Sequence, residues 1–124
     1  MDEDDAWHAR ARDWFAATTD PVVVPSTVVQ ETAYLLGDRQ GPRIESGFLR
    51  AVANGEFRFE PVNEVDIARA ADLVDAYADF PLGFVDASIV AVAERLDITG
   101  LLTTDRKHFG VVRPAHSKQL RLLP

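Results

Sequence analysis

The chain has 124 residues, of which 47% are hydrophobic and 27% charged, and it contains no cysteine. These values predict a single globular domain over residues 1–124 and exclude disulfides and thiolate metal sites. The formal net charge of −7 argues against a nucleic-acid partner unless basic side chains gather on one face. Such a cluster follows Asp105, where five lysines and arginines occur without an acid, although a solvated tail would have the same composition.

The first half of the chain alternates helical and strand patterns. An amphipathic helix is expected over residues 5–17, followed by a short buried strand at 21–25. The next helix is expected over residues 27–37, with a Thr-x-x-Gln capping box at its start and Gly37 near its end. Another helix is expected over residues 42–53, before the Asn-Gly pair that closes it.

The second half continues the alternation. A strand is expected at residues 57–62, an amphipathic helix over 64–79 and a helix over 85–96 that is apolar on nearly every face and therefore buried. The remaining elements are a strand at 100–104, a helical turn at 105–109 and a last strand at 120–123. Strands that alternate with helices predict an α/β fold of three layers, α/β/α, with a mainly parallel sheet.

No stretch of the sequence approaches the roughly 18 continuous apolar residues of a membrane span. Met1 is followed by four acidic residues, which is the opposite of the basic start of a secretory signal peptide. We therefore expect a cytoplasmic protein without a membrane partner, and the absence of cysteine agrees with a reducing compartment.

Three acidic residues occupy positions that are unusual for surface carboxylates. Glu31 shares an apolar helical stripe with Val28 and Leu35, unless it is paired with an arginine or lies at the edge of the stripe. Asp86 lies in the first turn of the apolar helix, where it could instead stabilise the helix start. Asp105 follows a strand, although it could also cap the turn after it. Each acid alone therefore has an ordinary structural explanation.

Taken together, these acids predict a metal site. Ligands of parallel α/β sheets bind beyond the carboxyl ends of the strands, where Asp105 would lie. Carboxylates brought together repel one another unless a divalent cation joins them, and ligation by oxygen alone suits Mg²⁺ or Mn²⁺ rather than zinc. Such ions activate water and stabilise charge in phosphodiester cleavage.

Four segments occur in the order typical of one family: DEDDAWHARARDWF, VVVPSTVVQETAYLL with Glu31, PLGFVDASIVAVAERL with Asp86, and LLTTDRKHF with Asp105. In this respect the chain resembles a PIN domain, and most of all the toxin subunit of a VapBC-type toxin–antitoxin pair. The resemblance implies a Mg²⁺- or Mn²⁺-dependent ribonuclease that cleaves RNA, forms a homodimer and is neutralised by a cognate VapB-like antitoxin.

The resemblance also implies roles for individual residues. The metal ligands, which are also catalytic, would be Glu31, Asp86 and Asp105. The hydroxyl of Thr104 would help to orient the site, and Arg106 and Lys107 would contact RNA phosphates. An antitoxin would place an amphipathic helix in a hydrophobic groove. Such a groove would be lined by Trp7, Trp14 and Phe15, unless these residues belong to the core.

One departure from the family pattern leaves two functions open. Members begin with a hydrophobic strand that ends in Asp-Thr or Asp-Ser and supplies the first acid, whereas this sequence begins after that point. We therefore expect an N-terminally short PIN-like domain, with Met1 an internal or misassigned start or the product of a cut. The chain would be either an active ribonuclease or a catalytically impaired module that binds antitoxin or RNA without turnover. A metal-dependent DNase is a third alternative, for which the chain is short.

Overall fold

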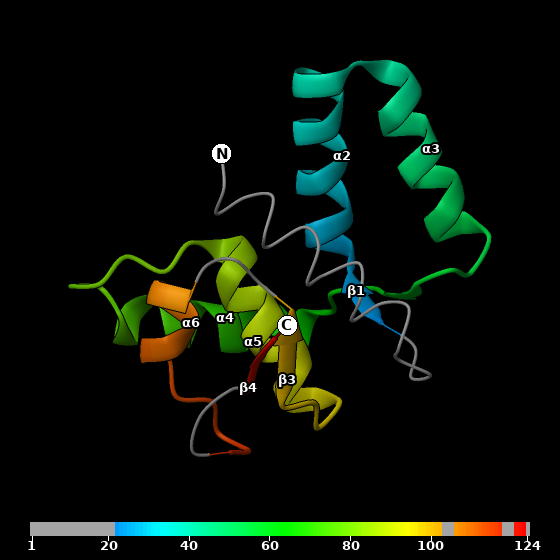
Figure 1. Cartoon of the computed structure of the whole chain (residues 1–124). Helices are drawn as coiled ribbons and strands as arrows, with labels where there is room; N and C mark the ends of the chain where they lie inside the picture. Colours follow the sequence, from blue (N-terminus) through cyan, green and yellow to red (C-terminus); the bar gives the residue numbers. More distant parts are fainter. Residues whose placement is uncertain (1–21, 103–105, 118–120, 124) are drawn as a thin grey trace. The chain divides into compact units, whose positions relative to one another are not determined.

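The computed structural model describes residues 22–102, 106–117 and 121–123 (Figure 1). The described residues form two compact units, one that runs to Val92 and one that begins at Ala93. The helix expected over residues 5–17 lies outside the described residues, and a single domain over the whole chain stays a prediction.

A parallel pair of strands organises the first unit. Strand β1, Val23–Pro25, pairs with strand β2, Arg58–Glu60, so that Val24 lies opposite Phe59. Both strands fall within the segments in which strands were predicted. Because the strands are parallel, the chain that connects them must return from the carboxyl end of β1 to the end of the pair at which β1 begins. Two helices form this connection.

Helix α2, Ser26–Gln40, and helix α3, Pro42–Ala53, form an antiparallel hairpin (Figure 1). Helix α3 has the predicted bounds, but the prediction that α2 ends near Gly37 is wrong. The side chain of Glu45 approaches Gly37 so closely that a Cβ there would lie 2.5 Å from Oε1. This glycine therefore permits close packing of the two helices. The chain turns instead at Gly41, whose φ of +91° lies in the region that favours glycine.

The predicted capping box at the start of α2 is also wrong. The helix begins one residue earlier than expected, so its N-cap is Pro25, which makes no side-chain cap hydrogen bond. The hydroxyl of Ser26 instead accepts a hydrogen bond of 2.9 Å from the backbone N–H of Val62. A capping box does form at the start of helix α4, Glu64–Ala76, where Asn63 and Asp66 exchange hydrogen bonds through their side chains and backbone.

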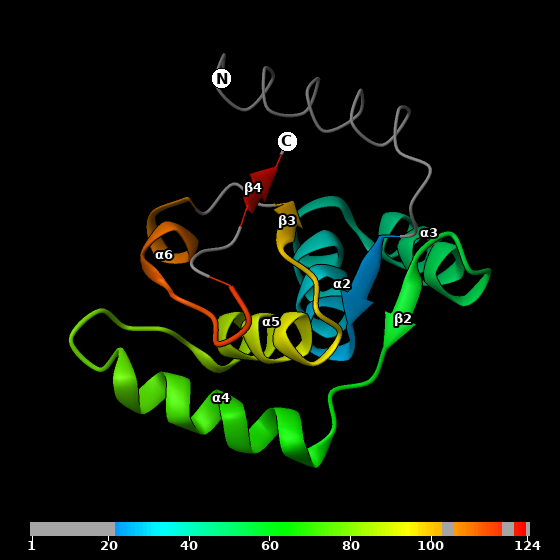
Figure 2. The same cartoon turned by 90° about the horizontal axis from the view of Figure 1, so that it is seen from below.

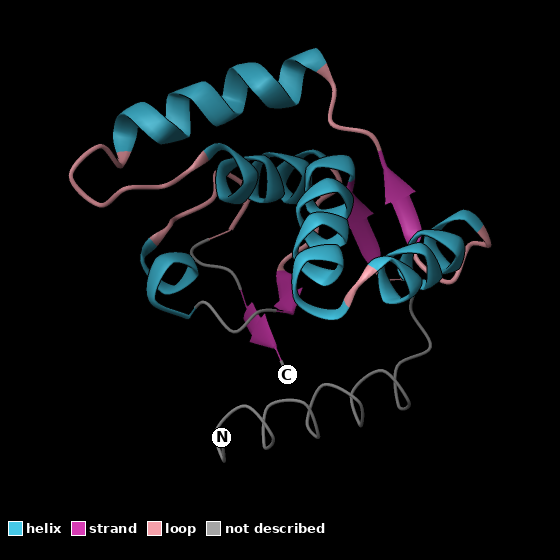
Figure 3. Ribbon diagram, turned by 90° about the horizontal axis from the view of Figure 1, so that it is seen from above, coloured by secondary structure: helices cyan, strands magenta, loops and turns pink. Residues whose placement is uncertain are grey.

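Helices α4 and α5 supply most of the buried side chains of the first unit. Helix α5, Phe84–Arg95, runs beside α4 (Figure 3). The core residues on α4 are Ala70 and Leu73, and those on α5 are Ala87, Val90, Ala91 and Val92. The buried character predicted for residues 85–96 from their apolar sequence is thereby confirmed. The buried residues of α5 begin at Ala87, directly after Asp86 in the first turn of the helix.

A second parallel pair organises the unit that begins at Ala93. Strand β3, Gly100–Leu102, pairs with strand β4, Arg121–Leu123 (Figure 2). Helix α6, Arg106–Val111, is longer than the turn predicted for residues 105–109. In the segment after α6, the ring of His116 is hydrogen-bonded through Nε2 to the carbonyl oxygen of Ile98, at 2.7 Å.

The α/β class predicted from the alternation of strands and helices is confirmed, since both described strand pairs are parallel and helices connect their strands. Among the described helices, none combines the length and the apolar character needed to cross a membrane.

Candidate functional site

The carboxyl ends of β1 and β2 lie at the same end of the two-stranded parallel sheet. The two parallel strands end at Pro25 and Glu60, and α2 starts directly after β1. The hydrogen bond from Val62 to the hydroxyl of Ser26 ties the segment after β2 to the first turn of α2. Ligands of parallel sheets bind beyond this end of the sheet.

A second hydroxyl joins α2 to α5. Thr27 Oγ1 lies 2.6 Å from Ser88 Oγ, and Ser88 Oγ donates to the carbonyl oxygen of Val85, also at 2.6 Å. Because a serine hydroxyl has a single proton, Thr27 is the donor to Ser88. Ser88 is fully buried, so this chain of hydrogen bonds holds the first turns of the two acid-bearing helices together (Figure 2).

Glu31 lies one helical turn beyond Thr27 on the same face of α2. Its side chain is exposed, as is that of Leu35, so the expectation of a carboxylate on a buried stripe is wrong. The stripe is open to solvent because the buried face of α2 centres on Ala33. No ion pair joins Glu31 to another described residue, and the arginine partner considered from the sequence is therefore not found in that part of the chain.

Asp86 is the third residue of α5 and is half-buried. A carboxylate in the first turn of a helix is stabilised by the positive end of the helix dipole. Ser88 is two positions after Asp86, which corresponds to a rotation of about 200° around the helix. The hydroxyl contact thus fixes the position of the helix start, while the carboxylate projects from another face of α5.

Of the three predicted metal ligands, two lie on helices whose first turns are in contact, and the third is outside the described residues. Thr104 and Asp105 fall in the range 103–105, whereas Arg106 and Lys107 begin α6. Within the described ranges no group of three or more histidines, aspartates or glutamates gathers closely enough to hold a metal. Convergence of the three acids therefore stays a prediction.

The donor chemistry of the two described acids fits a hard cation. Glu31 and Asp86 offer carboxylate oxygens, and the exposed Glu31 has no competing cation among the described residues. Mg²⁺ and Mn²⁺ prefer oxygen ligands of this kind and keep several of their own water molecules.

Thr27 and Ser88 were not singled out from the sequence as members of this region. The sequence pattern predicts a helix cap at Thr27 and places Ser88 in an apolar helix. The signal that points to Ser88 is its polarity in such a helix, because a buried hydroxyl is almost always hydrogen-bonded. The partner, 61 residues away, cannot be deduced from that rule.

Replacement of Ser88 by alanine is expected to destabilise the protein by about 1–3 kcal/mol, because the hydroxyl of Thr27 loses its buried partner. Urea unfolding of Ser88→Ala and wild type measures this difference. Ser46→Ala, which removes an exposed hydroxyl on α3, is the matched control and should change the free energy of unfolding by less than about 0.5 kcal/mol. Equal effects of the two substitutions would contradict the assigned contact.

Comparisons with known proteins match most of the chain. The sequence profile of the PIN domain family matches residues 1–113. The chain is 32% identical to ribonuclease VapC26 of Mycobacterium tuberculosis (strain ATCC 25618 / H37Rv) over 117 residues, which are 94% of this chain and 87% of that protein. The structure is similar to the crystal structure of Mycobacterium tuberculosis VapC20, a sarcin–ricin loop cleaving toxin. The TM-score is 0.71 at 25% identity, with 77% of this chain and 73% of VapC20 covered.

Proposed function

This chain belongs to the PIN-domain family, and from that premise we propose that it is an endoribonuclease toxin of the VapC type. The observation that carries the proposal is the 32% identity to ribonuclease VapC26, because it extends over nearly the full length of both chains. The likeness of the structure to VapC20, which cleaves the sarcin–ricin loop, supports the same activity class. The α/β fold of PIN type expected from the sequence is confirmed by these matches.

In this proposal, the acids beyond the strand ends hold Mg²⁺ or Mn²⁺. The ligands are Glu31, Asp86 and Asp105, and the hydroxyl of Thr104 orients the site. A divalent ion held by these residues would supply an activated water molecule and would offset negative charge on the scissile phosphate. The contact between Thr27 and Ser88 supports the arrangement, since it fixes the helix starts near which Glu31 and Asp86 lie.

The residues that follow Asp105 complete the proposed site. Arg106 and Lys107 bind phosphates of the RNA, so that the positive charge that follows Asp105 in the sequence counteracts the repulsion of the substrate by an acidic protein. The carboxylates themselves cannot attract RNA, and the bound cation reverses the sign of the local charge.

The proposed partners are those of a toxin–antitoxin pair. A VapB-like antitoxin would neutralise the chain, and two copies of the chain would form a homodimer. Co-purification with a co-expressed antitoxin, with loss of RNA cleavage in the complex, would support the first partner. Light scattering of the purified chain would test the second.

The decisive test is cleavage of RNA by the purified chain in the presence of Mn²⁺. We expect internal cuts in single-stranded RNA, in the sarcin–ricin loop that VapC20 cleaves, or in both, and no cuts in DNA of the same sequence. Binding of RNA without cleavage would instead identify the chain as a catalytically impaired PIN-like module. Cleavage of DNA alone would overturn the proposal in favour of a deoxyribonuclease.

A further inference from the structure

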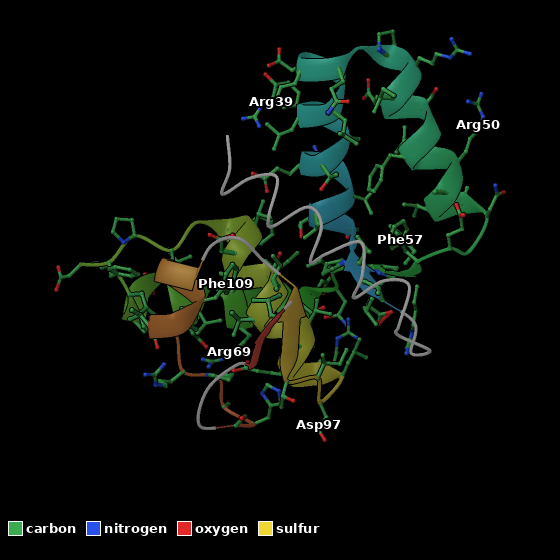
Figure 4. The ribbon with its side chains drawn as sticks, in the orientation of Figure 1. Arg39, Arg50, Phe57, Arg69, Asp97 and Phe109 are labelled. Atoms are coloured by element: carbon green, nitrogen blue, oxygen red, sulfur yellow. The ribbon has the colours of Figure 1, made fainter. Side chains whose placement is uncertain are left out.

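The outer face of α3 carries two arginines and no acid. Arg43 and Arg50 are seven residues apart, which places them within about 20° of each other around the helix and about 10 Å apart along it. Both side chains are exposed, and Figure 4 shows Arg50 directed away from α2. The one acid of α3, Glu45, lies against Gly37 of α2 and hence on the opposite side.

Hydrogen bonds order this face of the helix. Arg50 Nη1 donates to Ser46 Oγ at 3.3 Å, and Ser46 Oγ donates to the carbonyl oxygen of Arg43 at 3.2 Å. The guanidinium of Arg50 is thereby restrained along the helix surface. A side chain ordered in advance loses less entropy when a ligand binds to it.

Gly47 leaves an open space on the helix surface between the two arginines. Gly47 lies there without a side chain, and nothing comes within 4 Å of the position that a Cβ would occupy. An extended polyanion can therefore approach the helix closely between the two positive charges. A guanidinium binds a phosphate through two parallel N–H···O hydrogen bonds, which suits it to this kind of ligand.

We propose that Arg43, Ser46, Gly47 and Arg50, here called the arginine face, bind the phosphate backbone of the RNA substrate. The inference rests on the proposed function. Charge complementarity favours RNA, because the net charge of −7 makes a local positive surface necessary for association. A protein partner is less suited, since the four residues of the arginine face carry no apolar side chain, and the exposed Ile44 and Leu49 of α3 lie about 100° around the helix from Arg43 and Arg50, respectively.

The test measures RNA affinity without cleavage. A fluorescent single-stranded RNA and the sarcin–ricin loop are titrated with the full chain in EDTA, at several KCl concentrations. Arg43→Gln/Arg50→Gln is expected to weaken binding roughly tenfold at low salt, because two phosphate contacts are lost. The slope of log affinity against log salt should become shallower by about 1.4, since each phosphate contact to a single strand contributes about 0.7.

Arg39→Gln is the matched control. Arg39 is an exposed arginine of α2 that projects from the side of the hairpin opposite to Arg50 (Figure 4). Its replacement removes the same charge but should leave the salt slope unchanged, whereas Arg43→Gln and Arg50→Gln alone should each reduce it. Ser46→Ala should weaken binding less than the loss of Arg50, because it frees the guanidinium without removing it.

The outcomes separate this inference from the proposed function. Unchanged affinity and slope in the double variant would overturn the arginine face, even if wild type cleaves RNA. If the double variant lost antitoxin binding but bound RNA as wild type does, the arginine face would be a site for a protein partner. This result would also overturn the proposal that the face binds RNA. If wild type does not cleave RNA but the double variant binds RNA more weakly than wild type, the arginine face is supported as an RNA-binding surface. The same result refutes the proposed ribonuclease activity.

Discussion

Replacement of Asp86 by asparagine is expected to lower RNA cleavage at least about 100-fold while the fold stays intact. The amide has nearly the shape of the carboxylate but no charge, so it binds a divalent cation weakly. Initial rates of cleavage in Mn²⁺, with circular dichroism and thermal unfolding of the same samples, measure the two effects separately.

Asp72→Asn is the matched control for this experiment. Asp72 is an exposed aspartate on α4 that is not among the proposed ligands, so the same chemical change should leave cleavage unaltered. A rate for Asp86→Asn equal to that of Asp72→Asn would remove Asp86 from the proposed site. Loss of activity accompanied by unfolding would show that Asp86 acts by stabilising α5 and would equally remove its role as a ligand.

Local patterns predicted where helices and strands lie, but not which residues end the helices. The apolar run of residues 85–96 predicts a buried helix because burial on every face requires apolar residues on every face. Gly37 was interpreted as the end of a helix, since glycine commonly ends helices. In the structure Gly37 lies inside α2 and leaves room for the side chain of Glu45, which approaches it from α3 after the chain turns at Gly41. Such an approach depends on tertiary packing, which a local pattern does not contain.

The same reasoning explains what could be predicted of the site. Resemblance to the family singled out Glu31 and Asp86 as ligands from their motifs, because residue types recur at fixed places in a shared fold, and their role as ligands stays a prediction. It did not identify the contact between Thr27 and Ser88, in which two hydroxyls 61 residues apart meet. Their pairing follows from the way β1 leads directly into α2 beside the start of α5, which is a property of the packed chain.

Removal of divalent cations is expected to abolish RNA cleavage, and Mn²⁺ or Mg²⁺ should restore it. The physical reason is the composition of the proposed site, in which the groups around the scissile phosphate are carboxylates and the substrate is itself negative. Without a cation these charges repel the scissile phosphate, and no group supplies an activated water molecule. Cleavage rates in EDTA, and after titration with each metal, measure the effect. Undiminished cleavage in EDTA would refute metal dependence.

Binding of the metal can be measured independently of cleavage. The electron paramagnetic resonance signal of free Mn²⁺ falls as the ion binds to the protein, so it reports affinity in the absence of RNA. Glu31→Gln and Asp86→Asn should each weaken this binding by about 10-fold or more, because the site loses one anionic oxygen ligand. Asp72→Asn should leave it unchanged. Equal affinity in all variants would show that the cation binds elsewhere, since each substitution exchanges one carboxylate for an amide.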